Sequence, residues 1–406
     1  MTPGSQTHFA RLYVHVFASA ACVLPVASYV LATFGWRPTD IGIGAAVLGI
    51  AGTASSPFWG RLDDRTRWAP RAAVLLIAAA ALTAALSLGR LPHLATWIAL
   101  ALFGAGEGPM DALLTTRVLA SGVHASRLGA LRAFGSVGWV LGLVLAATVL
   151  ALWPGHAEWV LVVAAVTAVT SPRSWGEGAA SPTGGTTGGA SMRAVARRSL
   201  PLKPMAGLLA VTLPTSIAMS AVVQFTAGWA HQELSAGPFL ACAPIALSAL
   251  LELPVLPQVD RLARTRSPLL VAVLAGPPLT LATAVLALFP SITSILAVQV
   301  LIAMSFSLLF VGQSRMLAAA VPADRQASAQ TMGSALITGA GGLVAGLVGG
   351  RVADGLGYAG LLGCLAALTA LGSALGGVAL LRAHRRENAG TPCRDTEASC
   401  TVVGNR

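Results

Sequence analysis

The sequence predicts an all-α membrane protein in which twelve transmembrane helices form two pseudo-symmetric six-helix halves. Composition is the first observation behind this prediction: 55% of the 406 residues are hydrophobic and only 10% are charged, whereas a soluble domain contains about 25% charged residues. The second is a succession of apolar runs, each about as long as a bilayer core is thick. The third is a weak repeat that relates the first half of the sequence to the second. A soluble globular fold is therefore excluded.

Twelve apolar runs are expected to form the spanning helices. The sixth run is the shortest, and a tight turn at Phe289 and Pro290 joins the ninth to the tenth. The runs cover residues 12–33, 40–59, 72–89, 94–115, 130–152, 157–171, 205–229, 237–257, 268–289, 291–314, 328–350 and 358–381.

A polar segment between the sixth and seventh runs divides the chain in two. Its Gly-, Ser- and Thr-rich stretch has too few apolar residues to bury a core, so we expect a linker. The predicted organisation is an N-terminal six-helix bundle at residues 1–171, a cytoplasmic linker at 172–204, a C-terminal six-helix bundle at 205–381 and a cytoplasmic tail at 382–406.

The net charge of +11 is explained by membrane topology. If both termini are cytoplasmic, only Arg37, Arg90 and Arg351 of the 26 Lys and Arg residues fall on the outer side. This distribution follows the positive-inside rule closely. We therefore expect a multi-pass protein of the cytoplasmic (inner) membrane, and no nucleic-acid partner.

The sequence contains no motif typical of catalysis or of a cofactor. Zinc-binding H-E-x-x-H, nucleophile-elbow, Cys/His and phosphate-cradling patterns do not occur in it. We therefore expect no enzyme activity, no cofactor and no metal. The expected protein is a monomeric carrier in the lipid bilayer that binds a small-molecule substrate and draws its energy from a gradient.

Two short segments repeat between the halves. The segment "ASRLGALRAFGS" (125–136) aligns with "ADRQASAQTMGS" (323–334), and the same offset pairs Arg117 with Arg315. A second pairing aligns "LDDRTR" (62–67) with "QVDRLARTR" (258–266). Two parallel six-span halves joined by a linker are the architecture of major facilitator transporters, in which substrate binds between the halves near the bilayer midplane.

The loop after the second span, "GRLDDRTR" (60–67), resembles the major facilitator motif G-x-L-x-D-R-x-G-R. Four positions match and the second glycine is missing. A tight turn is expected at the first glycine. In the family this loop is a conformational latch between the halves. The resemblance and the repeat together imply a latch formed by Gly60, Asp64, Arg65, Arg117, Asp260, Arg261 and Arg315.

The segment Arg132–Trp139 resembles the R-x-F-G-x-V-G-W segment of lactose-permease-type sugar/proton symporters. It also resembles "R-x-W-G-S-x-G" of the phenylpropionate-permease-like and nucleoside proton-symporter branches. "PMDA" (109–112) is similar to their P-L-x-D element, and "ELP" (252–254) is similar to an E-I-P element that sugar efflux transporters share. The resemblance implies that Arg132 binds a hydroxyl or carboxylate and that Trp139 offers a stacking face. An equal alternative is that Arg132 snorkels to the cytoplasmic interface.

Three carboxylates within predicted spans are the candidates for proton or substrate binding, because such groups are costly in a bilayer. They are Glu107, Asp111 and Glu252. Glu107 and Asp111 are four residues apart and share a helix face. Their mutual repulsion favours the protonated form of one of them. Pro109, which lies between them, is expected to kink the helix and to free the carbonyl of Ala105.

The two neighbouring carboxylates are assigned different roles. Glu107 is the candidate for proton or substrate binding. Asp111 is expected to be structural, through an ion pair with Arg117, Arg132 or the loop after the second span. Glu252 could bind a proton or pair with Arg261 or Arg315. Polarity alone adds weaker substrate-binding candidates: Gln224, Gln313, His15, Tyr29, Trp229 and Gln299.

These features predict a secondary active transporter that moves a small organic solute by alternating access. Proton-coupled symport is the leading hypothesis. The tenth span lacks the His and Glu of a lactose-type proton relay. The alternative is therefore an efflux carrier that exports a sugar, drug or other metabolite by proton antiport.

Overall fold

The computed structural model describes residues 3–66, 68–120, 125–171, 202–320 and 339–389. This part of the chain is helical throughout except for short turns, and it contains no strand, as the sequence predicts. The elements are α1 (Pro3–Val23), α2 (Ala27–Thr33), α3 (Pro38–Thr66), α4 (Ala69–Ser87), α5 (His93–Glu107), α6 (Met110–Ala120), α7 (Ala125–Leu152), α8 (Trp159–Val169), α10 (Leu202–Gln232), α11 (Pro238–Thr265), α12 (Pro268–Val273), α13 (Gly276–Leu288), α14 (Ile292–Ala297), α15 (Gln299–Ala320), the π-helical turn η2 (Ala345–Gly349) and α17 (Gly350–Ala389).

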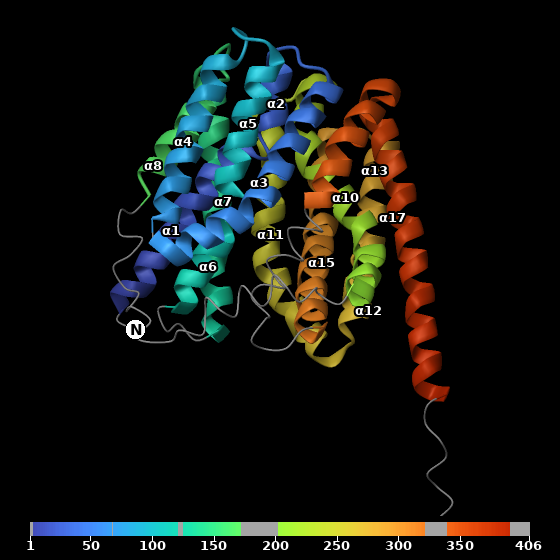
Figure 1. Ribbon diagram of the computed structural model, residues 1–406. Helices are drawn as coiled ribbons and strands as arrows, with labels where there is room; N and C mark the ends of the chain where they lie inside the picture. Colours follow the sequence, from blue (N-terminus) through green and yellow to red (C-terminus); the bar gives the residue numbers. More distant parts are fainter. Residues whose placement is uncertain (1–2, 67, 121–124, 172–201, 321–338, 390–406) are drawn as a thin grey trace, which may run out of the picture.

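The helices lie roughly parallel and run between two ends, which we call upper and lower after their positions in Figure 1. Eight described segments are long and apolar enough to cross a bilayer: Thr7–Thr33, Pro38–Asp63, Ala69–Ser87, Ala133–Leu152, Pro238–Thr265, Pro268–Leu288, Ile292–Met316 and Gly339–Arg382. The last of these turns at Gly357, whose φ of +72° is easy for glycine, and it covers the end of predicted span eleven and span twelve.

The predicted fourth, sixth and seventh spans are not among these eight segments. They correspond to α5 with α6, to α8 and to α10. The predicted linker is outside the described residues except for 202–204, as are residues 328–338 of predicted span eleven. The exact count of twelve therefore stays a prediction.

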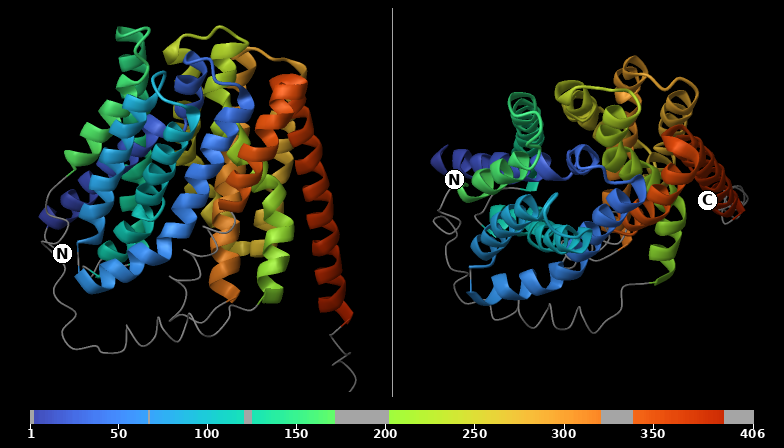
Figure 2. Two further views of the ribbon diagram at one scale, coloured as in Figure 1. Left: turned by 45° about the horizontal axis from the view of Figure 1, so that its top comes forward. Right: turned by 90° about the horizontal axis from the view of Figure 1, so that it is seen from above.

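The two halves pack side by side. Figure 2 shows, from above, the blue-to-green helices of the N-terminal half on one side and the yellow-to-red helices of the C-terminal half on the other. Across the boundary α2 packs on α10, α7 on α11, and α3 on η2 and α17. Within the N-terminal half, Gly138 of α7 lies against the backbone of Val14 in α1. Small residues of this kind allow close helix packing in membranes.

Candidate functional site

The fourth span is interrupted where the sequence predicts it. Helix α5 ends at Glu107, and α6 begins at Met110, after Gly108 and Pro109. Glu107 and Asp111 are both half-buried, and their carboxylates are close enough to interact electrostatically. Among the described residues, no hydrogen bond or ion pair reaches the Glu107 carboxylate. Glu107 is therefore available to a proton or a ligand.

The carbonyl of Ala105, freed by the proline, is paired by the neighbouring helix. Ser55 and Trp59 of α3 both donate to this oxygen, from Oγ at 2.8 Å and from Nε1 at 2.7 Å. A proline removes the N–H that would otherwise bond the carbonyl four residues earlier, and a polar group without a partner is costly in a membrane. The sequence predicted the freed carbonyl, and the structure adds its two donors.

Glycines bring the backbones of α3 and α5 into contact beside the carboxylates. A Cβ on Gly104 would overlap the backbone of Leu48, and one on Gly108 would lie 2.6 Å from the Cα of Gly52. The break at Pro109 is therefore fixed against α3. Because Glu107 ends α5, its position depends on this contact.

Arg117 of α6 binds Asp63 of α3, with Nη2 at 2.6 Å from Oδ1. Both side chains are mostly buried, at 11% and 15% exposed, so the pair ties the lower end of the fourth span to the second. The sequence analysis assigned Arg117 to the latch, but for the carboxylate it chose Asp64, the residue that follows Asp63. The expected ion pair between Asp111 and Arg117 stays a prediction.

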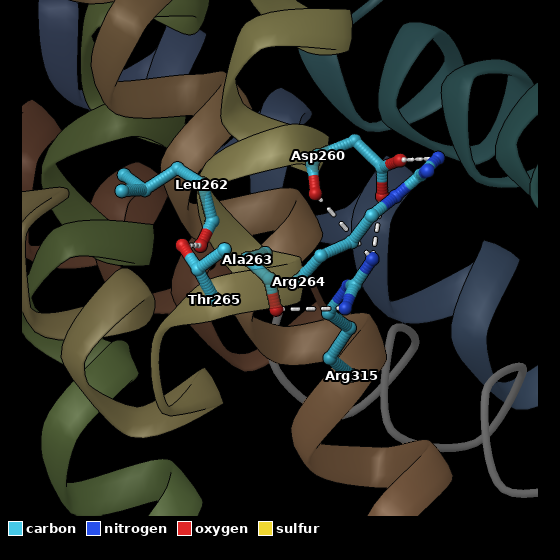
Figure 3. Close-up of polar contacts among 6 residues, drawn as sticks. All are labelled: Asp260, Leu262, Ala263, Arg264, Thr265 and Arg315. Carbon is cyan, nitrogen blue, oxygen red and sulfur yellow. Dashed lines mark hydrogen bonds and ion pairs between the residues drawn. The ribbon is translucent and has the colours of Figure 1, made fainter.

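The C-terminal half contains the corresponding pair. Arg315 of α15 lies 2.8 Å from Asp260 of α11 and also donates to the carbonyl of Ala263 at 2.7 Å (Figure 3). Arg264 lies 3.0 Å from the other oxygen of the same carboxylate. The sequence repeat that pairs Arg117 with Arg315 therefore has a structural counterpart, since each arginine ties two helices of its own half together.

The predicted latch is described only in part. Gly60 does not form the expected turn: α3 continues through it to Thr66, and a Cβ there would meet open space. The side chains of Asp64 and Arg65 are outside the described residues. Arg261 is exposed on α11. A contact between the halves through this loop stays a prediction.

The substrate contacts predicted on the fifth and eighth spans are Arg132, Trp139 and Glu252, and the structure describes the side chains of the last two. Arg132 belongs to α7, but its side chain is outside the description. Trp139 is half-buried and meets the ring of Phe17 in α1 edge-on, with centroids 6.5 Å apart. Glu252 is half-buried on α11. Arg315, one of the partners expected for Glu252, is bonded to Asp260.

Two amide side chains point between helices of the C-terminal half. Gln313 of α15 donates to Ser216 of α10 at 3.4 Å, and Gln224 of α10 donates to the carbonyl of Gly342 at 3.3 Å. The Oε1 of Gln224 is buried and has no hydrogen-bond partner in the described structure. This oxygen is therefore available to a donor on a ligand.

Several residues that link the helices were not identified from the sequence. Asp63 is adjacent to the predicted Asp64, and only the packing of α3 selects it. Ser55 and Trp59 were overlooked, although the predicted freed carbonyl implied donors on a neighbouring helix. Contacts between the halves at the upper end, such as the hydrogen bond from Thr39 to Asp354, join residues that have no shared pattern in the sequence.

The arrangement is that of a membrane transporter of the major facilitator type. The family model described as "MFS_1 like family" matches residues 7–360, and the chain belongs to this family. A comparison with curated protein sequences finds no match.

Solved transporter structures share the fold. The nucleoside transporter NupG superposes with a TM-score of 0.72 at 15% identity, covering 92% of this chain and 98% of its own. An auto-inhibited POT family peptide transporter gives 0.70 at 15% identity, with 94% and 97% covered. A POT family transporter in complex with a thioalcohol-conjugated peptide gives 0.69 at 13% identity, with 96% and 97% covered. At these identities the likeness establishes the fold alone.

Proposed function

We propose that the protein moves a small organic solute across the cytoplasmic membrane by alternating access, in symport with protons. The distribution of Lys and Arg supports a cytoplasmic location for both termini. The two bundles, at residues 1–171 and 205–381, provide the surfaces between which the solute binds.

Glu107 is the proposed proton-binding residue. The observation behind this assignment is the half-buried carboxylate at the end of α5, beside Asp111 and without a hydrogen-bond partner among the described residues. Two neighbouring carboxylates are unfavourable when both are charged, so binding of one proton relieves their repulsion. Asp111 has the structural role in this proposal.

The proposed solute contacts come from both halves. Arg132 and Trp139 are the N-terminal candidates, by resemblance to the symporters. Gln224, Gln313 and Glu252 are the C-terminal candidates. A carboxamide with a free buried oxygen, as in Gln224, suits a ligand hydroxyl or amine.

The proposal is tested in two stages. A thermal-shift screen of the purified protein against sugars, nucleosides, aromatic acids and drugs identifies solutes that bind. Vesicle transport is then measured with and without a pH gradient. We expect Glu107→Gln to lose pH-driven accumulation and to retain solute exchange. Glu158→Gln, a carboxylate change at the upper end, is the matched control and should retain both.

Full pH-driven accumulation by the Glu107→Gln protein would exclude Glu107 as the coupling residue. Proton antiport would instead be favoured if solute moved only in the direction opposite to the flow of protons down the pH gradient.

A further inference from the structure

One face of α4 is apolar and exposed along its length. Leu75, Leu82 and Leu86 are 63%, 43% and 68% exposed, and Ala79 between them is also exposed. Their spacing places these side chains on a single helix face. The opposite face packs on α5 and α8, and Figure 1 shows α4 on the side of the bundle away from the C-terminal half. Since Ala69–Ser87 is apolar and long enough to cross a bilayer, the exposed face lies against lipid.

A tryptophan and an arginine lie at the lower end of this face. Trp68 directly precedes α4 and is 63% exposed. The guanidinium carbon of Arg71 lies 5.1 Å from the centroid of the Trp68 ring, which is a cation–π contact. Trp68, Arg71 and Leu75 are spaced so that they continue the same helix face. A guanidinium stacked on a ring keeps its N–H donors at its edge, in the planar arrangement that fits two oxygens of a phosphate.

The length of the face matches one leaflet of a bilayer. The rise of an α-helix separates Arg71 from Leu82 by about 16 Å. Half of the hydrocarbon core is about 15 Å thick. When the guanidinium lies at the level of the phospholipid phosphates, an acyl chain along the face therefore reaches Leu82. Tryptophan is enriched at this level of the membrane, which agrees with the exposure of Trp68.

The charge differs between the two ends of α4. At the lower end, Arg61 of α3 is exposed and adds to the positive charge of Arg71. The carboxylate of Asp63, also at this end of α3, is neutralised by an ion pair within the N-terminal half. Beyond the upper end, Arg90 lies 4.0 Å from the carboxylate of Glu158, which offsets its charge. The lower end of the exposed face is therefore the end that attracts an anion.

We propose that the lower part of this face is a binding site for an anionic phospholipid such as phosphatidylglycerol. Arg71, held by Trp68, binds the phosphate. One acyl chain lies along the face, over the small Ala79 between Leu75 and Leu82. An anionic lipid is favoured because the headgroups of phosphatidylcholine and phosphatidylethanolamine carry an ammonium group that offsets the charge of the phosphate. The lipid site depends on the outer face of α4 alone, so its test is independent of the transport proposal.

Lipid retention by the purified protein tests the site. The protein in uncharged detergent receives equal amounts of phosphatidylglycerol and phosphatidylcholine with identical acyl chains, and bound lipid is counted by native mass spectrometry. We expect the unaltered protein to retain about five-fold more phosphatidylglycerol, and Arg71→Gln to retain the two lipids equally. Trp68→Leu should reduce the preference in part, because the ring only orients the guanidinium. The matched control, Arg90→Gln, removes an exposed arginine beyond the upper end of α4 and should keep the full preference.

A further variant tests the acyl-chain part of the site. Ala79→Phe fills the gap between two leucines on the exposed face, so it should lower the retention of phosphatidylglycerol although Trp68 and Arg71 are intact. Soluble glycerophosphoglycerol, the headgroup without acyl chains, should not displace the lipid, and displacement by it would overturn the lipid site. The site is also overturned if the unaltered protein retains both lipids equally, or if Arg71→Gln changes the preference no more than Arg90→Gln does.

Discussion

Removing the two side-chain donors to the Ala105 carbonyl tests how the interrupted fourth span is stabilised. The donors come from Ser55 and Trp59 on α3, and Pro109 prevents the backbone from supplying its own. Ser55→Ala and Trp59→Phe each remove one hydrogen bond and leave the other. The double variant leaves the carbonyl with neither donor.

The free energy of unfolding should respond non-additively. A typical hydrogen bond contributes about 0.5–1.5 kcal/mol net, whereas an acceptor left unpaired costs about 1–3 kcal/mol. We therefore expect each single change to cost about 1 kcal/mol. The double change should exceed the sum of the single changes by about 1–2 kcal/mol, because only the double variant leaves the Ala105 carbonyl unpaired.

A third substitution tests whether the loss of stability comes from the unpaired carbonyl of Ala105. Pro109→Ala restores a backbone N–H four residues after Ala105, so it should recover part of the loss in the double variant. Trp97→Phe is the control: it removes a hydrogen bond to the carbonyl of Asp40, also between α3 and α5. Pro109→Ala should not compensate for that change.

The assay is reversible unfolding in mixed detergent, followed by circular dichroism because a tryptophan is altered. The reasoning is refuted if the two single changes are additive within about 0.5 kcal/mol and Pro109→Ala restores nothing. The double variant should also displace the side chain of Glu107, because this residue ends the helix that the two donors hold in place. Solute exchange by the double variant at permissive temperature checks that consequence.

Two further outcomes follow from the helix contacts. Arg315→Ala should lower the free energy of unfolding by about 1–3 kcal/mol, because hydrogen bonds to both Asp260 and a backbone carbonyl are lost. Arg264→Ala should lower it by only about 0–1 kcal/mol, as for an exposed ion pair. Equal losses in the two variants would contradict this ranking. Gly104→Ala should cost about 1–3 kcal/mol by overlap with the α3 backbone, whereas Gly49→Ala, which meets open space on α3, should be close to neutral in the same unfolding assay.

Local residue patterns predicted much of the fold and part of the site. The apolar runs predicted the helices because a bilayer requires about 20 apolar residues for each crossing. Pro109 predicted the interruption of the fourth span and the freed carbonyl, since the effect of a proline on its own helix depends on the local sequence alone. The repeat predicted that Arg117 and Arg315 occupy equivalent places, and both form ion pairs that join neighbouring helices.

The sequence predicted less well which side chains pair between helices and where a helix ends. Asp63 and Asp64 are adjacent, so their side chains point in different directions around the helix, and the sequence could not show which one faces Arg117. Gly60 was expected to form a turn, but α3 remains helical to Thr66. A helix end of this kind depends on what packs around it as well as on a single glycine.

The sequence by itself determined that this is a transporter of two helical halves in a membrane, because span length, charge distribution and repeated motifs are properties of consecutive residues. Only the tertiary structure decided which groups meet between helices: Ala105 with Ser55 and Trp59, and Asp354 with Thr39. Thr39 and Asp354 are far apart in the sequence and have no shared pattern. Their contact exists only because the second span packs against the start of α17, and that packing is set by the whole bundle.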